Sequence, residues 1–434
     1  MRRFDKFNKY ELKKAFCVCL ASTMMLGAMS CGKADEDNNH SSSTIIKDEK
    51  IENASSTDSG EEFDENSKDV KAKTKEIERY IDKYFYFDED NDKREESYYD
   101  GLMKGLDDPY SVYYTADEYQ QLKESDAGSF EGIGATVAKN PDSGVIYVVK
   151  PLSDSPAEKA GLLPGDIILK VDDLELTTDM ELDYVVRHIR GEKGTDVNIT
   201  VYREDEPEDL TFTITRDKIE TKTVEYEMLD DNIGYIYVEE FIENTPKFFK
   251  EAVDDLQNQG AKGIVIDMRS NPGGLVNAVT EMLDYLLDDE LIAEGSDEAG
   301  LLIKTKDKND EVMDEYGCSD GHSVDLPMAV IVNGNSASAA EIFAGCLQDY
   351  KKAKIVGTTT YGKGIVQTVV PLSDGSAIKI TIAQYFIPSG KTVHKVGVEP
   401  DVEVELDESL LKKTDIEHDE DNQLQEAIKA LDLD

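Results

Sequence analysis

Basic residues are scarce in this sequence, and their scarcity excludes one large class of partner. Lysine and arginine together number 47, against 93 aspartate and glutamate residues, so the formal net charge is -46. A nucleic-acid site needs a concentrated basic patch, and no folded-looking stretch supplies one. We therefore expect no nucleic acid among its partners. The acidity instead predicts a soluble, self-repelling surface.

Cysteine is equally sparse, and its placement excludes a disulfide framework. Three of the five cysteines lie within the first 31 residues, which leaves only Cys318 and Cys346 in the rest of the chain. Two cysteines cannot build a disulfide-dense scaffold or a cysteine-based zinc site.

The sequence also lacks an apolar run long enough for a comfortable membrane-spanning helix. Its apolar run from Ala15 to Met29 follows six basic residues and ends at Ser30-Cys31, which is the pattern of an export signal over residues 1–31. The pattern resembles a bacterial lipoprotein signal, in which Cys31 is lipidated, but it lacks the usual leucine three residues before the cysteine. Simple cleavage and an uncleaved anchor are the alternatives. Each of the three places the protein outside the cytoplasm, either membrane-attached or secreted.

The length of 434 residues predicts two or three domains after this signal. Residues 32–68 are polar and acidic with almost no apolar periodicity, which indicates a flexible tether. Residues 69–125 change to a helical pattern. An acidic string at residues 88–92 has the spacing that opens a calcium loop, but Lys93 and Tyr99 stand where that loop needs glycine and glutamate. No metal site is expected there.

Residues 126–218 read as a compact, strand-rich module with one main helix. The pattern predicts strands at 145–149, 167–171 and 197–202, and a helix at 179–190 with Leu182, Val185, Val186 and Ile189 on one face. Together with these elements, the strings Gly132-Ile133-Gly134-Ala135, SPAEKAGL and PGDII resemble the signature of a PDZ domain.

The residues Gly132, Ile133, Gly134 and Ala135 have a chemical rationale of their own. Glycines at 132 and 134 allow successive backbone N–H groups to converge on an anion such as the terminal carboxylate of a peptide. The strand that follows can accept the peptide as an added strand. A lone GxG is more often a tight turn, and a PDZ module also serves adhesion or scaffolding, so this module does not establish an enzyme.

Residues 219–434, which end in an acidic tail, alternate strands and helices and predict an α/β core. The whole chain is therefore expected to be a multidomain α+β protein. Two unusual loops each follow a strand and precede a helix in this core, where ligand groups commonly lie. Their sequences are DMRSNPGG at 267–274 and NGNSASAAE at 333–341.

Ser338 in the second loop has two interpretations. Ser338 and Glu341 fit a capping box, in which the two side chains satisfy free amides at a helix start. The same position also places a hydroxyl beside free N–H groups and the positive end of a helix dipole, where an oxyanion can be stabilised. A nucleophilic serine further requires a base.

The best candidate for that base is Lys363. Of the five histidines only His394 is placed to contribute, and a packing role suits it better. Lys363 lies between two glycines and before a predicted strand, in which Gln367 shares its face and can orient its amine. A lysine deprotonates serine only when neutral, so burial must lower its pKa from ~10.4 by about 2 to 3 units. Taken alone, GKG is more often an exposed turn.

The whole constellation resembles the carboxyl-terminal processing protease family of Ser/Lys peptidases, peptidase family S41. The resemblance covers about residues 70–401 and rests on strings in one order: GLDDPYS, NPGG, NGNSASAAEIFAG, TTTYGKGIVQTVVPLSDGSAIKIT, YFIPSGKTV and GVEPD. It implies that Ser338 is the nucleophile, Lys363 the general base and Gln367 its orienting partner. The amides of Gly273 or Gly274 and of Ala339 would form the oxyanion hole. Ala340 departs from relatives that have a third serine there.

The resemblance also implies a reaction and partners. Protein C-termini would be captured by the PDZ domain, and Ser338 would form an acyl-enzyme without any cofactor. By analogy, the PDZ domain gates the active site and the N-terminal helices support a homodimer. A catalytically inactive PDZ adaptor is the main alternative, and a small-ligand carrier is a weaker one. The intact Ser338, Lys363 and Gln367 argue against both.

Overall fold

The structure is a computed structural model that describes residues 43–45, 64–204, 206–319, 321–411, 413 and 416–433. The predicted export signal and most of the predicted tether lie outside these residues. The described chain forms two compact units, one mainly from residues 120–367 and 382–433, the other mainly from 64–119 and 368–381. No helix in the described part is both long enough and apolar enough to span a membrane.

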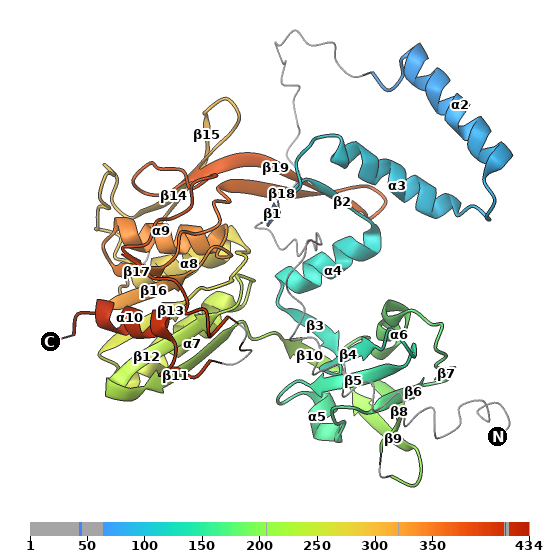
Figure 1. Cartoon of the computed structure of the whole chain (residues 1–434), viewed down its shortest axis with the longest axis horizontal. Coiled ribbons are helices and arrows are strands. Elements are labelled where there is room, and N and C mark those ends of the chain that lie inside the picture. Colours follow the sequence, from blue (N-terminus) through green and yellow to red (C-terminus); the bar gives the residue numbers. More distant parts are fainter. Residues whose placement is uncertain are drawn as a thin grey trace. The chain divides into compact units, whose positions relative to one another are not determined.

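The smaller unit contains two exposed helices, α2 (Lys68–Tyr84) and α3 (Asn91–Lys104), shown in blue in Figure 1. Each begins at a polar residue whose side chain accepts a backbone amide of the first turn, Ser67 for α2 and Asp90 for α3. Helix α2 buries none of its residues. Its stability therefore does not come from an apolar face packed within the described chain.

The GLDDPYS motif ties the two chain segments of the smaller unit together. Asp108 accepts hydrogen bonds from the hydroxyls of Ser111 (2.6 Å) and Thr381 (2.7 Å). Beside it, strand β2 (Val112–Tyr114) pairs antiparallel with β19 (Ala377–Phe386). The motif thus has a structural role in this unit.

The PDZ region begins after α4 (Ala116–Asp126) and has its own apolar core. Its sheet has the order β4-β5-β6-β8-β9, so β4 (Ala135–Lys139) is an edge strand. Val185 and Ile189 of α6 point into the core, whereas Val186 faces a surface pocket, so the predicted four-residue apolar face is only partly correct. The other elements are β3 (Ser129–Gly132), β5 (Ile146–Pro151), α5 (Pro156–Ala160), β6 (Ile167–Val171), β7 (Leu174–Glu175), α6 (Leu182–Ile189), β8 (Asp196–Tyr202), β9 (Leu210–Thr215) and β10 (Asp217–Glu220).

The α/β core is a six-stranded sheet with the order β11-β12-β13-β16-β17-β20, parallel except for the β11–β12 pair. This confirms the predicted α/β alternation. The sheet and its helices are β11 (Val224–Leu229), the 3-10 turn η1 (Asp230–Asn232), β12 (Ile233–Val238), α7 (Thr245–Asn258), β13 (Gly263–Asp267), α8 (Val276–Leu286), β16 (Met328–Val332), α9 (Ala339–Asp349), β17 (Ala353–Gly357), β20 (Val402–Glu403) and α10 (Asn422–Ala430).

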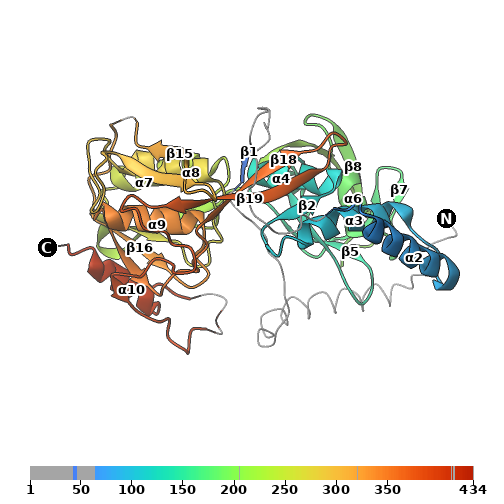
Figure 2. The same ribbon diagram turned by 90° about the horizontal axis from the view of Figure 1, so that it is seen from above.

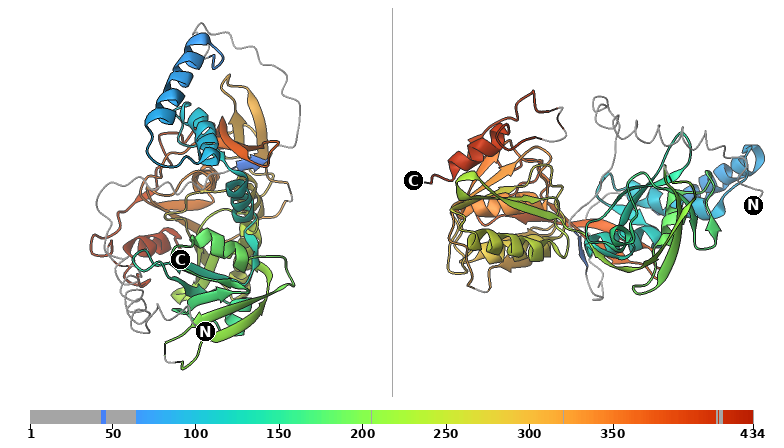
Figure 3. Two further views of the ribbon diagram at one scale, coloured as in Figure 1. Left: turned by 90° about the vertical axis from the view of Figure 1, so that its right-hand side faces the viewer. Right: turned by 90° about the horizontal axis from the view of Figure 1, so that it is seen from below.

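Alternate residues of the central strands serve two separate apolar layers. Ile264 and Ile266 of β13 pack in the main core with α7, α8 and α9, whereas Val265 packs on the other face with Leu424 and Ala427 of α10. Figure 2 and Figure 3 show α10 opposite α7 and α8 across the sheet. Both faces of β13 and β16 are therefore covered, which explains why these strands are continuous apolar runs.

A second sheet carries the segment after the predicted lysine base. Its order is β18-β19-β14-β15, with β2 also on β19 and the short β1 (Ser43–Ile45) at the outer edge of β18. Its remaining strands are β14 (Leu301–Lys306), β15 (Val312–Gly317) and β18 (Ile365–Pro371). The β18 strand begins two residues after Lys363.

Candidate active site

Ser338 lies between β16 and α9, at the N-cap of the helix. Its side chain is fully buried, and its backbone has φ 55° and ψ -115°, a conformation that residues other than glycine rarely adopt. Such strain persists only where surrounding contacts enforce it, and it concentrates at functional sites. The predicted helix start is therefore correct, and its geometry is unusual.

Glu341, in the first turn of α9, stabilises this geometry. Its buried carboxylate accepts hydrogen bonds from the Ser338 amide (2.8 Å), the Lys363 amide (2.8 Å), the Gly362 amide (2.7 Å) and the Thr360 hydroxyl (2.6 Å). Burial raises the pKa of Glu341, although all four hydrogen bonds oppose that shift. The glutamate side of the predicted capping box thus forms, and it also fixes the lysine loop.

Tyr385 makes a second bridge between the same two residues. Its buried hydroxyl lies 3.1 Å from the Ser338 carbonyl oxygen and 2.9 Å from the Lys363 carbonyl oxygen. Burial raises the pKa of Tyr385 well above its ordinary value, so the phenol remains a proton donor. Two buried side chains, Glu341 and Tyr385, therefore hold Ser338 and Lys363 side by side.

Lys363 is buried, with 5% of its surface exposed, and so is Gln367 on β18. The glycines on either side admit another chain segment. A Cβ on Gly364 would lie 2.4 Å from the His394 amide nitrogen, and the Lys395 amide donates to the Gly362 carbonyl oxygen (2.7 Å). His394 therefore packs its backbone against this loop. Burial, and secondarily Lys395, lower the pKa of its imidazole.

The NPGG loop lies directly against Ser338. β13 and β16 are parallel neighbours, so the loops that follow them meet at one edge of the sheet. The Ser336 hydroxyl donates to the Met268 carbonyl oxygen (2.7 Å), and the Ala337 amide donates to the Asn271 carbonyl oxygen (3.0 Å). A Cβ on Gly273 would lie 2.7 Å from the Ser338 Cβ. Only glycine allows this approach.

The three amides predicted for the oxyanion hole differ in their surroundings. The Gly273 amide donates to Asn271 Oδ1 (2.8 Å), and this bond occupies it. Gly274 has φ 139° and lies against Phe241, whose carbonyl oxygen a Cβ would approach to 2.0 Å. The Ala339 amide lies 3.0 Å from the position of a Gly273 Cβ. Gly274 and Ala339 are therefore the better pair of donors.

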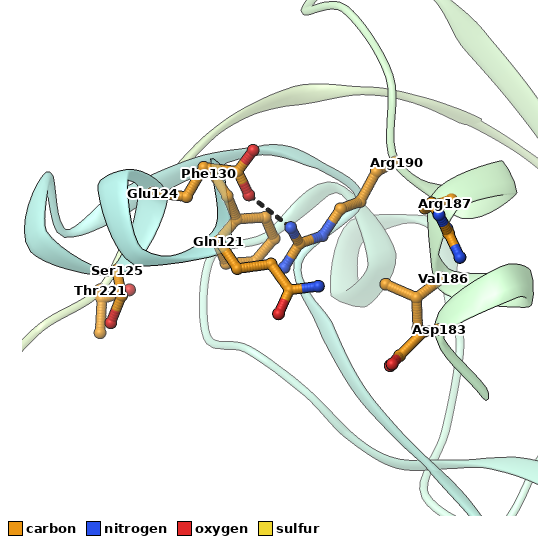
Figure 4. A pocket seen from close by; sticks show the side chains of 9 residues that line it. All are labelled: Gln121, Glu124, Ser125, Phe130, Asp183, Val186, Arg187, Arg190 and Thr221. Carbon is orange, nitrogen blue, oxygen red and sulfur yellow. Dashed lines mark hydrogen bonds and ion pairs between the residues drawn. The ribbon is translucent and has the colours of Figure 1, made fainter. Parts of the chain in front are cut away.

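The PDZ region has a pocket of about 360 Å³, shown in Figure 4, and two of its lining residues, Phe130 and Arg190, lie next to the glycine loop. Gly134 adopts φ 73°, Ile133 is buried, and Ala135 begins the edge strand β4. Gly132 lies next to the ring of Phe130 and the side chain of Arg190, because a Cβ on it would be 3.5 Å and 3.7 Å from their atoms.

Arg190 is a residue that no local sequence pattern singles out. Its guanidinium lies 5.1 Å from the centre of the Phe130 ring and forms an ion pair with Glu124 of α4, marked in Figure 4. It is a cation beside the loop expected to hold a carboxylate. Arg190 is distant in sequence from that loop, so only the fold brings them together.

Comparisons with known proteins match both regions. The PDZ domain model matches residues 131–214, and the model of peptidase family S41 matches residues 232–404. A CtpA-like serine protease of Staphylococcus epidermidis is 38% identical over 341 residues, which are 78% of this chain and 67% of the relative. The chain belongs to peptidase family S41. It is a serine-type peptidase with a PDZ domain.

A second staphylococcal relative of this S41 peptidase agrees. A CtpA-like serine protease of Staphylococcus aureus is 36% identical over 334 residues, covering 77% of this chain and 64% of the relative. The chain thus spans about two thirds of the length of these staphylococcal proteins. Among solved structures, a photosystem II D1 C-terminal processing protease is 31% identical, covers 79% of this chain and 88% of that chain, and has a TM-score of 0.43. An S41 protease from Bacteroides fragilis is 19% identical over 77% of this chain and 90% of that chain, with a TM-score of 0.45.

Proposed function

We propose that the protein is an extracytoplasmic endopeptidase in which Ser338 is the nucleophile, Lys363 the general base and Gln367 the residue that orients the lysine. The observation that carries this assignment is the double bridge by Glu341 and Tyr385, which holds the two backbones together in a buried site. Neutral lysine takes the serine proton as the hydroxyl attacks the scissile carbonyl carbon. No cofactor takes part in this scheme.

The oxyanion formed in that attack would accept hydrogen bonds from the amides of Gly274 and Ala339. Both lie at the point where the two loops touch, and the Ala339 amide is at the positive end of α9. Collapse of the tetrahedral intermediate leaves an acyl-enzyme and releases the C-terminal fragment, with the lysine returning its proton to the leaving amine. Lys363 then activates water for hydrolysis of the ester.

The PDZ domain would capture the C-terminus of a protein substrate. The edge strand β4 can pair with an extended peptide, and the amides around Gly132, Ile133, Gly134 and Ala135 would receive its carboxylate. The cation of Arg190 supports this assignment, because a charge-assisted hydrogen bond favours an anionic chain end.

Attachment to the outer face of the cell membrane is part of the proposal. The basic and apolar segment before Cys31 supports export, with lipidation at that cysteine as the anchor. We also propose a homodimer formed through the smaller unit. Its helical hairpin exposes Tyr84, Phe85, Tyr86 and Phe87, an apolar cluster typical of an interface.

The test compares three proteins lacking residues 1–31: the unmodified sequence, Ser338→Ala and Lys363→Ala. Each is incubated with an unstructured protein substrate and a peptide that occupies the PDZ domain. Both substitutions should lower kcat by about 10⁴-fold or more while retaining the fold. Equal cleavage by all three would exclude the Ser/Lys assignment. Absence of cleavage by the unmodified protein would favour the inactive adaptor.

A further inference from the structure

Arg269 lies between the end of β13 and the glycine pair of the NPGG loop, and its side chain is mostly buried. All five N–H groups of its guanidinium have acceptors. Nε and Nη2 donate to the Asp267 carboxylate (2.5–3.0 Å), Nη1 and Nη2 donate to the two oxygens of Asp421 (3.1 and 2.7 Å), and Nη1 also donates to Gln423 Oε1 (3.2 Å). The loop is therefore anchored through one fully satisfied cation.

The partners of Arg269 come from two distant parts of the catalytic core sequence. Asp267 ends β13, whereas Asp421 and Gln423 lie 152 and 154 residues after Arg269, beyond the residues 232–404 that match the S41 family model. Asp267, Asp421 and Gln423 are each at least 95% buried. Burial alone would lower the pKa of Arg269, but the hydrogen bonds and charges of Asp267 and Asp421 raise it overall. The cation is thus retained inside the protein.

Asp421 also has a second, local role that must be separated from this one. It is the N-cap of α10, and its Oδ1 accepts the amides of Gln423 and Leu424 (both 3.1 Å). Helix α10 packs on the sheet through Leu424, Ala427 and Leu431. One carboxylate therefore joins a packed C-terminal helix to the side chain of Arg269.

The loop that Arg269 anchors has little other freedom. Residues 270 to 274 are tied to the nucleophile loop and to Phe241, and three of them have positive φ: Ser270, Gly273 and Gly274. A shift of about 1 Å in a catalytic group can cost about 100-fold in rate. Because these residues move together, a displacement of Arg269 at the start of the loop would also displace the Gly274 amide.

We infer that Asp421 is a positioning residue: by clamping Arg269 bidentately from helix α10, it fixes the NPGG loop so that the Gly274 amide faces the oxyanion. The C-terminal helix, outside the matched family region, is by this inference part of the catalytic apparatus. The inference rests on the oxyanion role proposed above for Gly274.

Three variants separate the clamp from the helix cap. Asp421→Asn keeps an oxygen that can cap α10, because asparagine is also a good N-cap. It removes the negative charge that holds the Arg269 guanidinium. Asp421→Ala removes both. Glu420→Gln is the matched control, since it neutralises a neighbouring carboxylate whose ion pair is with the exposed Lys413.

Steady-state kinetics and hydrogen exchange are measured on the full chain without residues 1–31. For Asp421→Asn we expect kcat to fall about tenfold with KM nearly unchanged, because the lost contact acts in the transition state. Affinity for a peptide aldehyde, which mimics the tetrahedral intermediate, should fall by a similar factor. Amides of residues 268–275 should exchange at least about tenfold faster, while α10 keeps its protection. Asp421→Ala should lose protection in both regions.

The outcomes decide separately on the two claims. If the unmodified protein cleaves and Asp421→Asn keeps its kcat and aldehyde affinity within about twofold of Glu420→Gln, the inference is wrong. If the unmodified protein and Ser338→Ala are equally inactive, the proposed function fails, and loop exchange alone then decides the inference. Unchanged exchange at 268–275 in Asp421→Asn would overturn it.

Discussion

The catalytic loops and the PDZ pocket handle charge and polarity in opposite ways. Ser338, Lys363 and Gln367, the proposed nucleophile, base and orienting amide, are 0%, 5% and 0% exposed, and one buried carboxylate beside them accepts four hydrogen bonds. In the PDZ pocket, the side chains of Arg190 and Glu124 are 39% and 31% exposed and form a single ion pair. By the proposed function, chemistry that requires fixed distances is built into the core, whereas capture of varied chain ends uses a partly exposed surface.

The difference predicts that substitutions in the two places change different quantities. In the core, losing one hydrogen-bonding atom should lower kcat and stability together, because the partners left behind are buried. At the PDZ pocket, losing a charge should change substrate capture and leave folding almost unchanged.

Of the substitutions that test this comparison, Glu341→Gln should lower kcat and stability the most. In either orientation, the amide NH₂ of glutamine would face at least one N–H group that now donates to a carboxylate oxygen, so we expect kcat to fall at least about 100-fold. Urea unfolding should show a loss of about 3 kcal/mol, since buried donors lose their acceptor. Glu281→Gln, at an exposed pair with Lys250, is the control and should change neither quantity. Normal activity in Glu341→Gln would show that the bridge is not needed.

Tyr385→Phe should have the second largest effect on kcat and stability. It removes the hydroxyl that links the carbonyl oxygens of Ser338 and Lys363, but the Glu341 bridge remains. We expect kcat to fall about tenfold and the free energy of unfolding to fall by about 1 to 2 kcal/mol. A loss of stability without any change in kcat would limit Tyr385 to packing.

Much of the site could be predicted from local sequence. Ser338, Lys363 and the NPGG loop all stand at strand ends among glycines or at a helix start, so turn and capping preferences reveal them. Apolar patterning predicted β12, β13 and β16 correctly, because buried parallel strands are short apolar runs.

What the sequence could not provide are contacts between distant segments. Tyr385 reads as an ordinary strand residue, and nothing local connects it with Ser338, 47 positions away. The Arg269–Asp421 pair is separated by 152 positions, and Asp421 stands in an acidic tail where a carboxylate attracts no notice. Which glycine amide is occupied also depends on the side chain of Asn271, whose orientation is set by the fold.

Arg190→Ala should lower the stability of the protein less than either of the two core substitutions. Loss of a half-exposed ion pair should cost less than about 1 kcal/mol of stability. For a substrate bearing a free C-terminal carboxylate, KM should rise about fivefold with kcat unchanged, because charge-assisted capture is lost. Lys218→Ala, an exposed lysine of β10, is the charge-matched control. An equal rise in KM for a C-terminally amidated substrate would contradict the role in carboxylate binding.

The pH dependence of kcat tests the central claim most directly, because a lysine base acts only when it is neutral. We predict that kcat rises with pH along a single limb whose apparent pKa lies below the ordinary value for lysine, reaches a plateau above it, and is unchanged in His394→Ala. Burial, and secondarily Lys395, lower the pKa of the His394 imidazole, which favours its neutral form. A limb that disappears in His394→Ala, together with retained activity in Lys363→Ala, would contradict the Ser338–Lys363 mechanism.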